Sequence, residues 1–339
     1  MPSPTLPAEL AGARLHVVTG KGGVGKTTVA AALALALAST GKRVLIVEVE
    51  GRQGLSQTFD VPPLGTSEVR LVAHKSGGEL WGLSVDAKAA LLEYLQLFYK
   101  LGRAGSALEK IGAIDFATTI APGVRDVLLI GKVYEAAGRP KGGRGSGRTS
   151  GLHYDAVVLD APPTGRAVRF LNVNAGVADV AKMGPIKTQA DSITRMLHDK
   201  RTLIHMVTLL EEMPVQESLD GLRDLAGVGL HIGALVVNQI REPHLTPAHL
   251  TALKGGDAEL DELLRTELTN AGLRPTNPMV RGLISEGRDH AQRLALQEEM
   301  TREIADAGPP VIELPALVGG TEDGGIAVLA DELLEQGMA

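Results

Sequence analysis

One nonapeptide sets the architecture of this chain: Gly20-Lys21-Gly22-Gly23-Val24-Gly25-Lys26-Thr27-Thr28. A glycine, four further residues and then Gly-Lys-Thr is the spacing of a phosphate-binding P-loop. The glycines let backbone N–H groups converge on phosphate oxygens, and the amino terminus of a following helix adds partial positive charge. The motif therefore predicts a nucleoside triphosphate site in which Lys26 contacts the β and γ phosphates, Thr27 binds Mg²⁺ and Thr28 contacts the α phosphate.

The segments around this loop have the order that a P-loop requires. A β-branched run at 15–19 predicts a buried strand, and an Ala- and Leu-rich run at 26–39, followed by Gly41, predicts a helix. A second apolar run at 43–49 predicts another strand, which completes a right-handed parallel crossover. A glycine-rich turn without a ligand is the alternative, and the strand–loop–helix context argues against it.

Strands and helices continue to alternate along the chain. Further strands are predicted at 154–160, 204–210, 231–238 and 311–315, and most of the remaining sequence has helical patterning. The pattern predicts an α/β fold of the P-loop NTPase type, with a mostly parallel sheet and helices on both faces. We expect a single ATPase domain over 1–339, with a helical insertion at about 86–138, a flexible Gly- and Arg-rich loop at 138–151 and a further helical segment at about 166–202.

Composition limits the kinds of function. None of the 339 residues is cysteine, which excludes disulfides, thiolate metal sites and cysteine nucleophiles. The formal net charge of −6 argues against a general nucleic-acid-binding surface. No apolar run is long enough to span a bilayer, and the amino terminus does not resemble a secretory signal. We therefore expect a cytoplasmic protein without an integral membrane segment.

Lys21 adds a feature that an ordinary P-loop does not need. With this lysine, the nonapeptide resembles the deviant Walker A class of ATPases. The resemblance implies a dimer in which Lys21 reaches the partner's nucleotide and offsets the charge that develops on the transferred phosphoryl group. For Lys21 taken alone, a solvated surface lysine is the alternative.

A second segment narrows the resemblance to one family. Residues 160–171, Asp-Ala-Pro-Pro-Thr-Gly-Arg-Ala-Val-Arg-Phe-Leu, resemble the second switch of the ArsA-like and tail-anchored-protein-targeting ATPases. The resemblance implies that Asp160 holds Mg²⁺ through water and that Thr164 and Gly165 sense the γ phosphate. Pro163 belongs to the same nucleotide-contacting segment.

The adenine side of the expected site comes from the same resemblance. Asn238 ends the strand predicted at 231–238, where the family's asparagine contacts the base, and Pro315 ends the last strand, where the family's adenine-flanking loop begins. An ordinary asparagine at a strand end is the alternative for Asn238.

The first switch departs from the family's pattern. Leu55, Ser56 and Phe59 align with it, but Glu50 stands where the family has the aspartate that positions the attacking water. We expect Glu50 to take that role with altered geometry, so that hydrolysis is slow or depends on a partner. A surface set of ion pairs that includes Glu48, Glu50 and Arg52 is the alternative.

Together these residues most resemble the actinobacterial ArsA-like ATPases, which occur as paired paralogues. The resemblance implies a hydrolase that binds ATP and Mg²⁺ and acts as a nucleotide-gated dimeric switch for a protein or membrane-protein client. The dimer is a homodimer or a heterodimer with a paralogous ATPase. Because the chain has no cysteine, neither a thiolate-based arsenite pump subunit nor a zinc-bridged dimer is expected. The alternatives are a partitioning or division-site type of ATPase, and a nucleotide-binding regulatory subunit of a heterodimer with weak hydrolysis.

Two helical segments are candidates for a client surface, 86–138 and 175–200. In the first, apolar residues recur at helical spacing: Leu91, Leu92, Leu95, Phe98 and Leu101. Such a stripe forms either a groove for an apolar segment or a contact with the protein's own core, and we favour the core.

Overall fold

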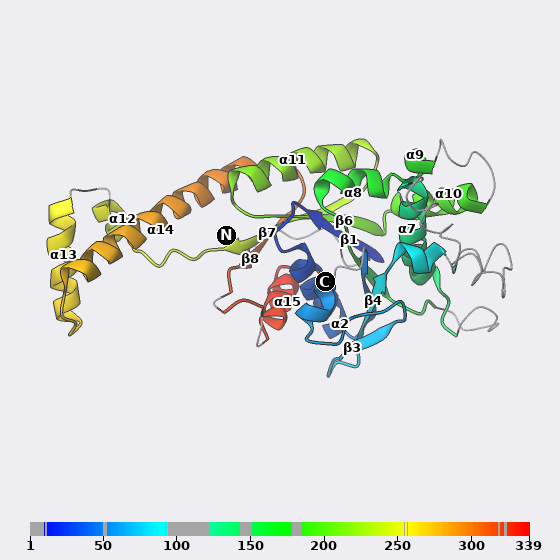
Figure 1. Cartoon of the computed structure of the whole chain (residues 1–339), viewed down its shortest axis with the longest axis horizontal. Helices are drawn as coiled ribbons and strands as arrows, with labels where there is room; N and C mark the ends of the chain where they lie inside the picture. Colours follow the sequence, from blue (N-terminus) through cyan, green and yellow to red (C-terminus); the bar gives the residue numbers. More distant parts are fainter. Residues whose placement is uncertain are drawn as a thin grey trace.

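One sheet runs through the part of the chain that this computed structural model describes, which comprises residues 10, 12–49, 53–91, 93, 122–142, 151–177, 185–253, 255, 257–317, 319–321 and 324–339. Its eight strands have the order β3-β4-β2-β5-β1-β6-β7-β8 (Figure 1). All neighbouring strands are parallel except β3 and β4. The strands are β1 (Leu15–Gly20), β2 (Arg43–Val49), β3 (Val69–Ala73), β4 (Glu79–Val85), β5 (Ala156–Asp160), β6 (Thr202–Thr208), β7 (Ile232–Ile240) and β8 (Val311–Pro315).

Helices cover both faces of this sheet, which confirms the predicted α/β fold with a mostly parallel sheet. One face packs against α2 (Lys26–Ser39) and α15 (Gly325–Glu335), and the short α3 (Gly54–Thr58) lies against α2. The other face is covered by α7 (Pro122–Gly138), α8 (Thr164–Leu171), α9 (Val173–Val177), α10 (Pro185–Leu197) and α11 (Glu212–Gly227).

The central strands are apolar on both sides because both sides are covered. In β1, Val17 joins the core under α7 to α11, whereas Val18 joins the core under α2 and α15. Helix α2 has almost no polar face, and Ala30 to Ala34 are completely buried, because the helix lies between the sheet and α15. Its alanines allow this close approach from two sides.

The strand order contains two features that the sequence pattern did not predict. The strands at 15–20 and 43–49 form the expected parallel crossover, but β5 lies between them in the sheet. In addition, β3 and β4 form an antiparallel hairpin that extends one edge of the sheet. Strand β3 escapes prediction because an edge strand that is partly exposed lacks a long apolar run.

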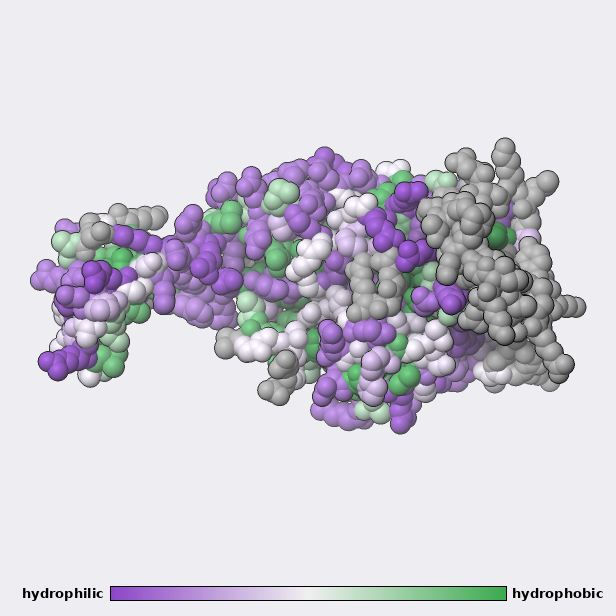
Figure 2. Space-filling view, in the orientation of Figure 1, coloured by the Kyte–Doolittle hydropathy of each residue, from purple (hydrophilic) through white to green (hydrophobic). Residues whose placement is uncertain are grey.

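A helical arm extends away from the sheet (Figure 1). It consists of α12 (Pro247–Leu253), α13 (Asp257–Asn270) and α14 (Asn277–Ile304), of which α14 has 28 residues and is therefore about 42 Å long. Its far end has a small core of its own, formed by Leu260, Val280 and Ile284. Figure 2 shows a mostly hydrophilic surface between this end and the body of the molecule. Helical sequence was predicted here, but not its projection.

Several sequence predictions fall partly outside the described residues. The helical insertion predicted at 86–138 is described at 86–91, 93 and 122–138, and the loop predicted at 138–151 is described at 138–142 and 151. Leu91 is buried, whereas Leu92, Leu95, Phe98 and Leu101 lie outside the residues whose side chains are described. Among the described helices, none combines the length and the apolar character that crossing a membrane requires.

Candidate functional site

The predicted site residues gather at the carboxyl edge of the parallel strands. The loop 20–28 joins β1 to α2, residues 160–165 join β5 to α8, and Asn238 lies near the end of β7. Since β5, β1, β6 and β7 are neighbours in the sheet, these three segments open at the same edge. This is the edge at which open α/β sheets bind their ligands.

Glycines let the loop backbone turn tightly and leave part of it uncovered by side chains. Gly25 caps the amino terminus of α2 with a φ of 87°, a conformation that other residues rarely adopt. A Cβ at Gly25 would also lie 2.3 Å from the side-chain nitrogen of Asn238. By contrast, among the described residues no atom beyond the chain neighbours lies within 4 Å of the Cβ positions of Gly22 and Gly23, which are exposed. The loop is therefore closed on the side of β7 and open on its other side.

Asn238 fastens the loop to the sheet. Its side-chain N–H donates to the carbonyl of Val24 at 2.9 Å, and its side-chain oxygen accepts from the backbone N–H of Gln239 at 3.0 Å. Gln239 has a φ of 60°, an uncommon value for a residue other than glycine. Pro315 lies beside the end of β7, paired with Ile240. Both residues are thus at the expected edge, and their contact with adenine stays a prediction.

Thr27 and Asp160 connect the loop to the second predicted switch. The Thr27 hydroxyl donates to Oδ2 of Asp160 at 2.6 Å, and Asp160 is 8% exposed. The Thr19 hydroxyl, at the end of β1, donates to the carbonyl of Pro162 at 2.8 Å. A hydroxyl and a carboxylate are hard oxygen ligands, the type that Mg²⁺ prefers, so the residues present fit this ion.

The second switch segment begins α8. Pro163 precedes the helix with φ −58° and ψ 155°, and Thr164 and Gly165 are its first two residues. Thr164 is 8% exposed, and its methyl group lies close to Gly221 of α11. In the described part of the chain, no atom other than those of its chain neighbours and its own helix backbone lies within 4 Å of the Cβ position of Gly165. The backbone of Gly165 is therefore accessible at the amino terminus of the helix, where an anion is favoured.

Both loop lysines contact groups of their own chain. The ammonium of Lys26 donates to the carbonyl of Lys21 at 2.9 Å, so it closes the loop on itself. The ammonium of Lys21 lies 2.9 Å from Oε1 of Glu217, on α11 of the same chain. Sequence reasoning did not identify Glu217, because no pattern marks an acid in the middle of a surface helix.

Glu48 has a structural role that the sequence analysis did not foresee. It is 1% exposed; Oε1 accepts from the N–H of Gln53 at 2.9 Å and from the hydroxyl of Ser84 at 3.0 Å, and Oε2 accepts from the N–H of Leu55 at 3.1 Å. The surface ion-pair alternative is therefore wrong for Glu48. A glutamate inside an apolar strand was the available signal. Glu50 and Arg52 lie outside the described residues.

The carboxylate of Glu48 holds α3 against the P-loop. Two of its hydrogen bonds are with backbone N–H groups at the amino terminus of α3, where a negative charge is favoured. At Gly54, the first residue of α3, a Cβ would lie 3.0 Å from the methyl carbon of Thr27. The first switch segment therefore lies against the residue expected to bind Mg²⁺.

Comparison with known proteins shows the family to which this chain belongs. Residues 13–198 match the family model of the anion-transporting ATPase, ArsA. The chain is 45% identical to ATPase BagA of Mycobacterium tuberculosis over 332 residues, which cover 98% of this chain and 96% of that protein. It is 24% identical to ATPase ARSA1 of Chlamydomonas reinhardtii over 296 residues, which cover 72% of this chain and 37% of that protein. Together with the P-loop, the Asp160 segment and the sheet, these similarities show that the chain belongs to the ArsA-like family of ATPases.

Proposed function

We propose that this chain is a Mg²⁺-dependent ATP hydrolase that acts as a nucleotide-gated dimeric switch for a protein or membrane-protein client. The observation that carries the proposal is the 2.6 Å hydrogen bond between Thr27 and Asp160, which joins the P-loop to the second switch segment. Nucleotide bound at one segment would move the other. In this proposal residues 1–339 form a single ATPase domain.

Each residue of the loop and switches has a role in this proposal. Lys26 leaves the carbonyl of Lys21 to bind the β and γ phosphates, together with the backbone N–H groups of 20–28. Thr27 and, through water, Asp160 hold Mg²⁺, which neutralises charge on the phosphates. Glu50 positions the attacking water, and Thr164 and Gly165 detect the γ phosphate. Asn238 and Pro315 flank the adenine.

Lys21 carries the dimeric part of the proposal. In this structure its ammonium is engaged by Glu217 of the same chain. In the dimer, which forms with a second copy or with a paralogous ATPase, Lys21 is released and contacts the partner's phosphates. The candidates for client binding are 86–138 and 175–200, the segments predicted to be helical, each of which lies partly outside the described residues.

Substitution of the two lysines tests the proposal. Isothermal titration with Mg·ATP and a phosphate-release assay are measured on the wild type, Lys26→Ala, Lys21→Ala and, as a control at an exposed lysine, Lys200→Ala. We expect Lys26→Ala to lower turnover at least about 100-fold, because one group that stabilises transferred charge is lost. Lys21→Ala should lower turnover while ATP still binds. Full turnover in Lys26→Ala would reject the proposal.

A second candidate function is a regulatory subunit of a heterodimer that binds nucleotide and hydrolyses it weakly. It is favoured by one departure from the family's pattern, the glutamate at position 50. Single-turnover hydrolysis by the isolated chain separates the two candidates. Chemistry that completes within one binding event supports the hydrolase, and bound ATP that stays intact supports the regulatory subunit.

A further inference from the structure

A large cavity lies at the opposite edge of the sheet from the nucleotide site. Its volume is about 1150 Å³, and its walls are α7 and α10. Arg14 and Leu15 contribute to it at the start of β1, and Arg201 and Thr202 at the start of β6. Because the P-loop follows the end of β1, the length of that strand separates the two sites.

One part of the cavity wall is apolar. Leu15 and Leu128 line it and are 1% and 3% exposed, and Met196 lines it from α10. Charged and polar side chains line the rest of the cavity, and a site with both kinds of surface suits an amphipathic small molecule. The long dimension of such a ligand would lie between α7 and α10.

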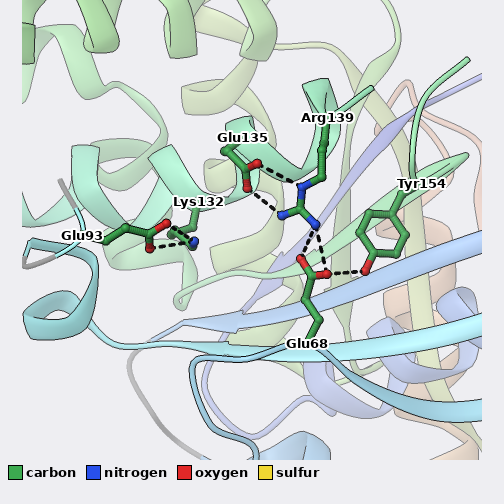
Figure 3. A network of polar contacts seen from close by, with 6 residues as sticks. All are labelled: Glu68, Glu93, Lys132, Glu135, Arg139 and Tyr154. Atoms are coloured by element: carbon green, nitrogen blue, oxygen red, sulfur yellow. Dashed lines mark hydrogen bonds and ion pairs between the residues drawn. The ribbon is translucent and has the colours of Figure 1, made fainter. Parts of the chain in front are cut away.

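Most charged groups around the cavity neutralise one another (Figure 3). The ammonium of Lys132 lies 2.8 Å from Glu93, and the Arg139 guanidinium is held between Glu135 at 2.7 Å and Glu68 at 2.8 Å. Arg201 lies 2.9 Å from Asp199. These cations are therefore not available to a ligand without the loss of an existing ion pair.

Arg14 is different from these cations. Its guanidinium donates to the carbonyls of Ala137 at 3.4 Å and Tyr154 at 3.2 Å, and among the described residues it has no acidic group within ion-pair distance. Burial lowers the pKa of Arg14, and the neighbouring Arg201 lowers it further, against the opposing effect of Asp155 and Asp199. A partly buried charge that is not in an ion pair is costly, and an anion in the cavity would relieve that cost.

Gln189 is the second polar group of the cavity that a ligand could contact. Gln189 lines it from α10, and its side-chain oxygen is buried without a hydrogen bond in the described structure. Its side-chain nitrogen lies close to Gly131 of α7, where a Cβ would be 2.3 Å from it. A buried acceptor is normally hydrogen-bonded, and a donor on a ligand would supply the missing hydrogen bond. Arg14 can therefore bind an anionic group and Gln189 a hydrogen-bond donor in the same cavity.

We propose that this cavity binds an amphipathic ligand with an apolar chain, an anionic carboxylate or phosphate group at Arg14 and a hydrogen-bond donor at Gln189. The chain occupies the space over Leu15, Leu128 and Met196. The proposal is independent of the nucleotide site, because no residue is common to the two. N-acyl amino acids and lysophosphatidates both have these three features.

Binding of defined probes to the full-length protein tests the proposal. The probes are lauroylglycine, pentadecanoate of equal chain length without the amide N–H, the uncharged lauroylglycine methyl ester, and lysophosphatidate, each below its micellar concentration. We expect saturable binding with lauroylglycine tighter than pentadecanoate and much tighter than the ester. Tighter binding of lysophosphatidate than of lauroylglycine would identify phosphate as the preferred head group, and the reverse would identify carboxylate.

Variants connect the binding to the cavity. Arg14→Ala should lower the affinity for lauroylglycine by about ten-fold or more, as expected for a lost charge-assisted hydrogen bond. Arg14→Lys should restore part of this affinity. Gln189→Leu should remove the preference for lauroylglycine over pentadecanoate. Ser192→Phe should block the cavity, while Arg223→Ala, which removes an exposed arginine paired with Asp220, should change nothing.

The outcome is separable from that of the proposed ATPase function. Lys26→Ala should lose Mg·ATP binding and keep lauroylglycine binding, and Ser192→Phe should do the opposite. Thermal unfolding, which ligand binding shifts upward, shows that each variant is folded and provides a second readout. Absence of saturable binding, or binding that is equal in the wild type, Arg14→Ala and Ser192→Phe, would overturn the proposal.

Discussion

The ion pair between Lys21 and Glu217 joins two residues whose partners are expected to change during the reaction. Both side chains are partly exposed, at 27% and 40%, so the pair contributes little stability, at most about 1 kcal/mol. A weak contact of this kind can be exchanged for a phosphate of a second chain.

We therefore expect Glu217→Gln to favour the dimer. Removing the intramolecular partner frees Lys21, so the protein concentration that gives half-maximal turnover should fall by about two- to five-fold. The measurement is phosphate release over a series of protein concentrations. In a Lys21→Ala background the same substitution should have no effect. Reduced turnover in Glu217→Gln would mean that Glu217 belongs to the active dimer instead.

A single buried carboxylate positions the short helix α3. Glu48 accepts hydrogen bonds from the backbone of Gln53 and Leu55, the residues that flank Gly54 at the start of this helix. Gln53 has a φ of 58°, and its side-chain amide makes two hydrogen bonds with the backbone of Leu64. An element of five residues depends on such contacts, because it is too short to be stable as a helix by itself.

Glu48→Gln should loosen this element. The amide keeps one acceptor but loses the negative charge, so we expect the free energy of unfolding to fall by about 1–3 kcal/mol. Because α3 lies against Thr27, the KM for ATP should rise as well. Denaturant unfolding and steady-state kinetics measure the two effects. Glu313→Gln, at an exposed strand glutamate, is the matched control and should leave both unchanged.

The far end of the helical arm is stabilised by a small core that is separate from the core of the sheet. Its far end is held by Leu260, Val280 and Ile284, whereas Met300 and Ile304 at the other end of α14 belong to the core under α11. Exposed apolar residues accompany the small core: Leu263, Leu273, Met279 and Leu283. The far end of the arm can therefore unfold without the sheet.

Ile284→Ala tests this separation. It should destabilise the far end of the arm by about 2–4 kcal/mol, the usual range for a buried isoleucine. Hydrogen exchange should then show lost protection in α12, α13 and the first half of α14, with unchanged protection in the sheet and unchanged ATP binding. The exposed neighbour Leu283→Ala is the control. Reduced protection in β6 or β7 would show that the arm and the sheet unfold together.

At the scale of the whole molecule, two histidines lie at the centre of the sheet. His16 of β1 and His205 of β6 are fully buried, and Nδ1 of one lies 3.1 Å from Nε2 of the other. Burial lowers the pKa of His16 from 6.5 to about 4, with a smaller contribution from Lys42. Burial and the neighbouring His16 also hold the pKa of His205 well below its usual value. Both rings are therefore neutral at pH 7.

This pair should make global stability depend on pH. Below pH 6.5 the unfolded chain gains protons that the folded chain does not, so the free energy of unfolding falls as the pH decreases toward about 4. For His16 alone the loss is about 3 kcal/mol. Chemical unfolding between these pH values measures it. The double variant His16→Leu and His205→Leu should flatten the curve, and His198→Leu, at an exposed histidine, should not.

The P-loop and the α/β architecture could be predicted from the sequence because they depend on local patterns. The nonapeptide lies between a β-branched run and an Ala-rich run within 25 residues, from Leu15 to Ser39, and each of these patterns is visible without the rest of the chain. The apolar runs that became β2 and β8 have the predicted bounds. Strand β2 is buried almost throughout because both of its faces are covered, whereas β8, at the edge of the sheet, alternates between buried and exposed residues.

The sequence did not predict which residues far apart in the chain contact one another, and only the tertiary structure shows these contacts. Asn238 binds the carbonyl of Val24 across 214 residues of sequence, and Lys21 meets Glu217 on another helix. The position of β5 between β1 and β2, the cavity around Arg14 and the projection of α14 have the same origin. No local pattern encodes them, since each depends on how separate elements pack on the sheet. The sequence by itself thus determined which chemistry the loop supports, and packing determined which side chains surround it.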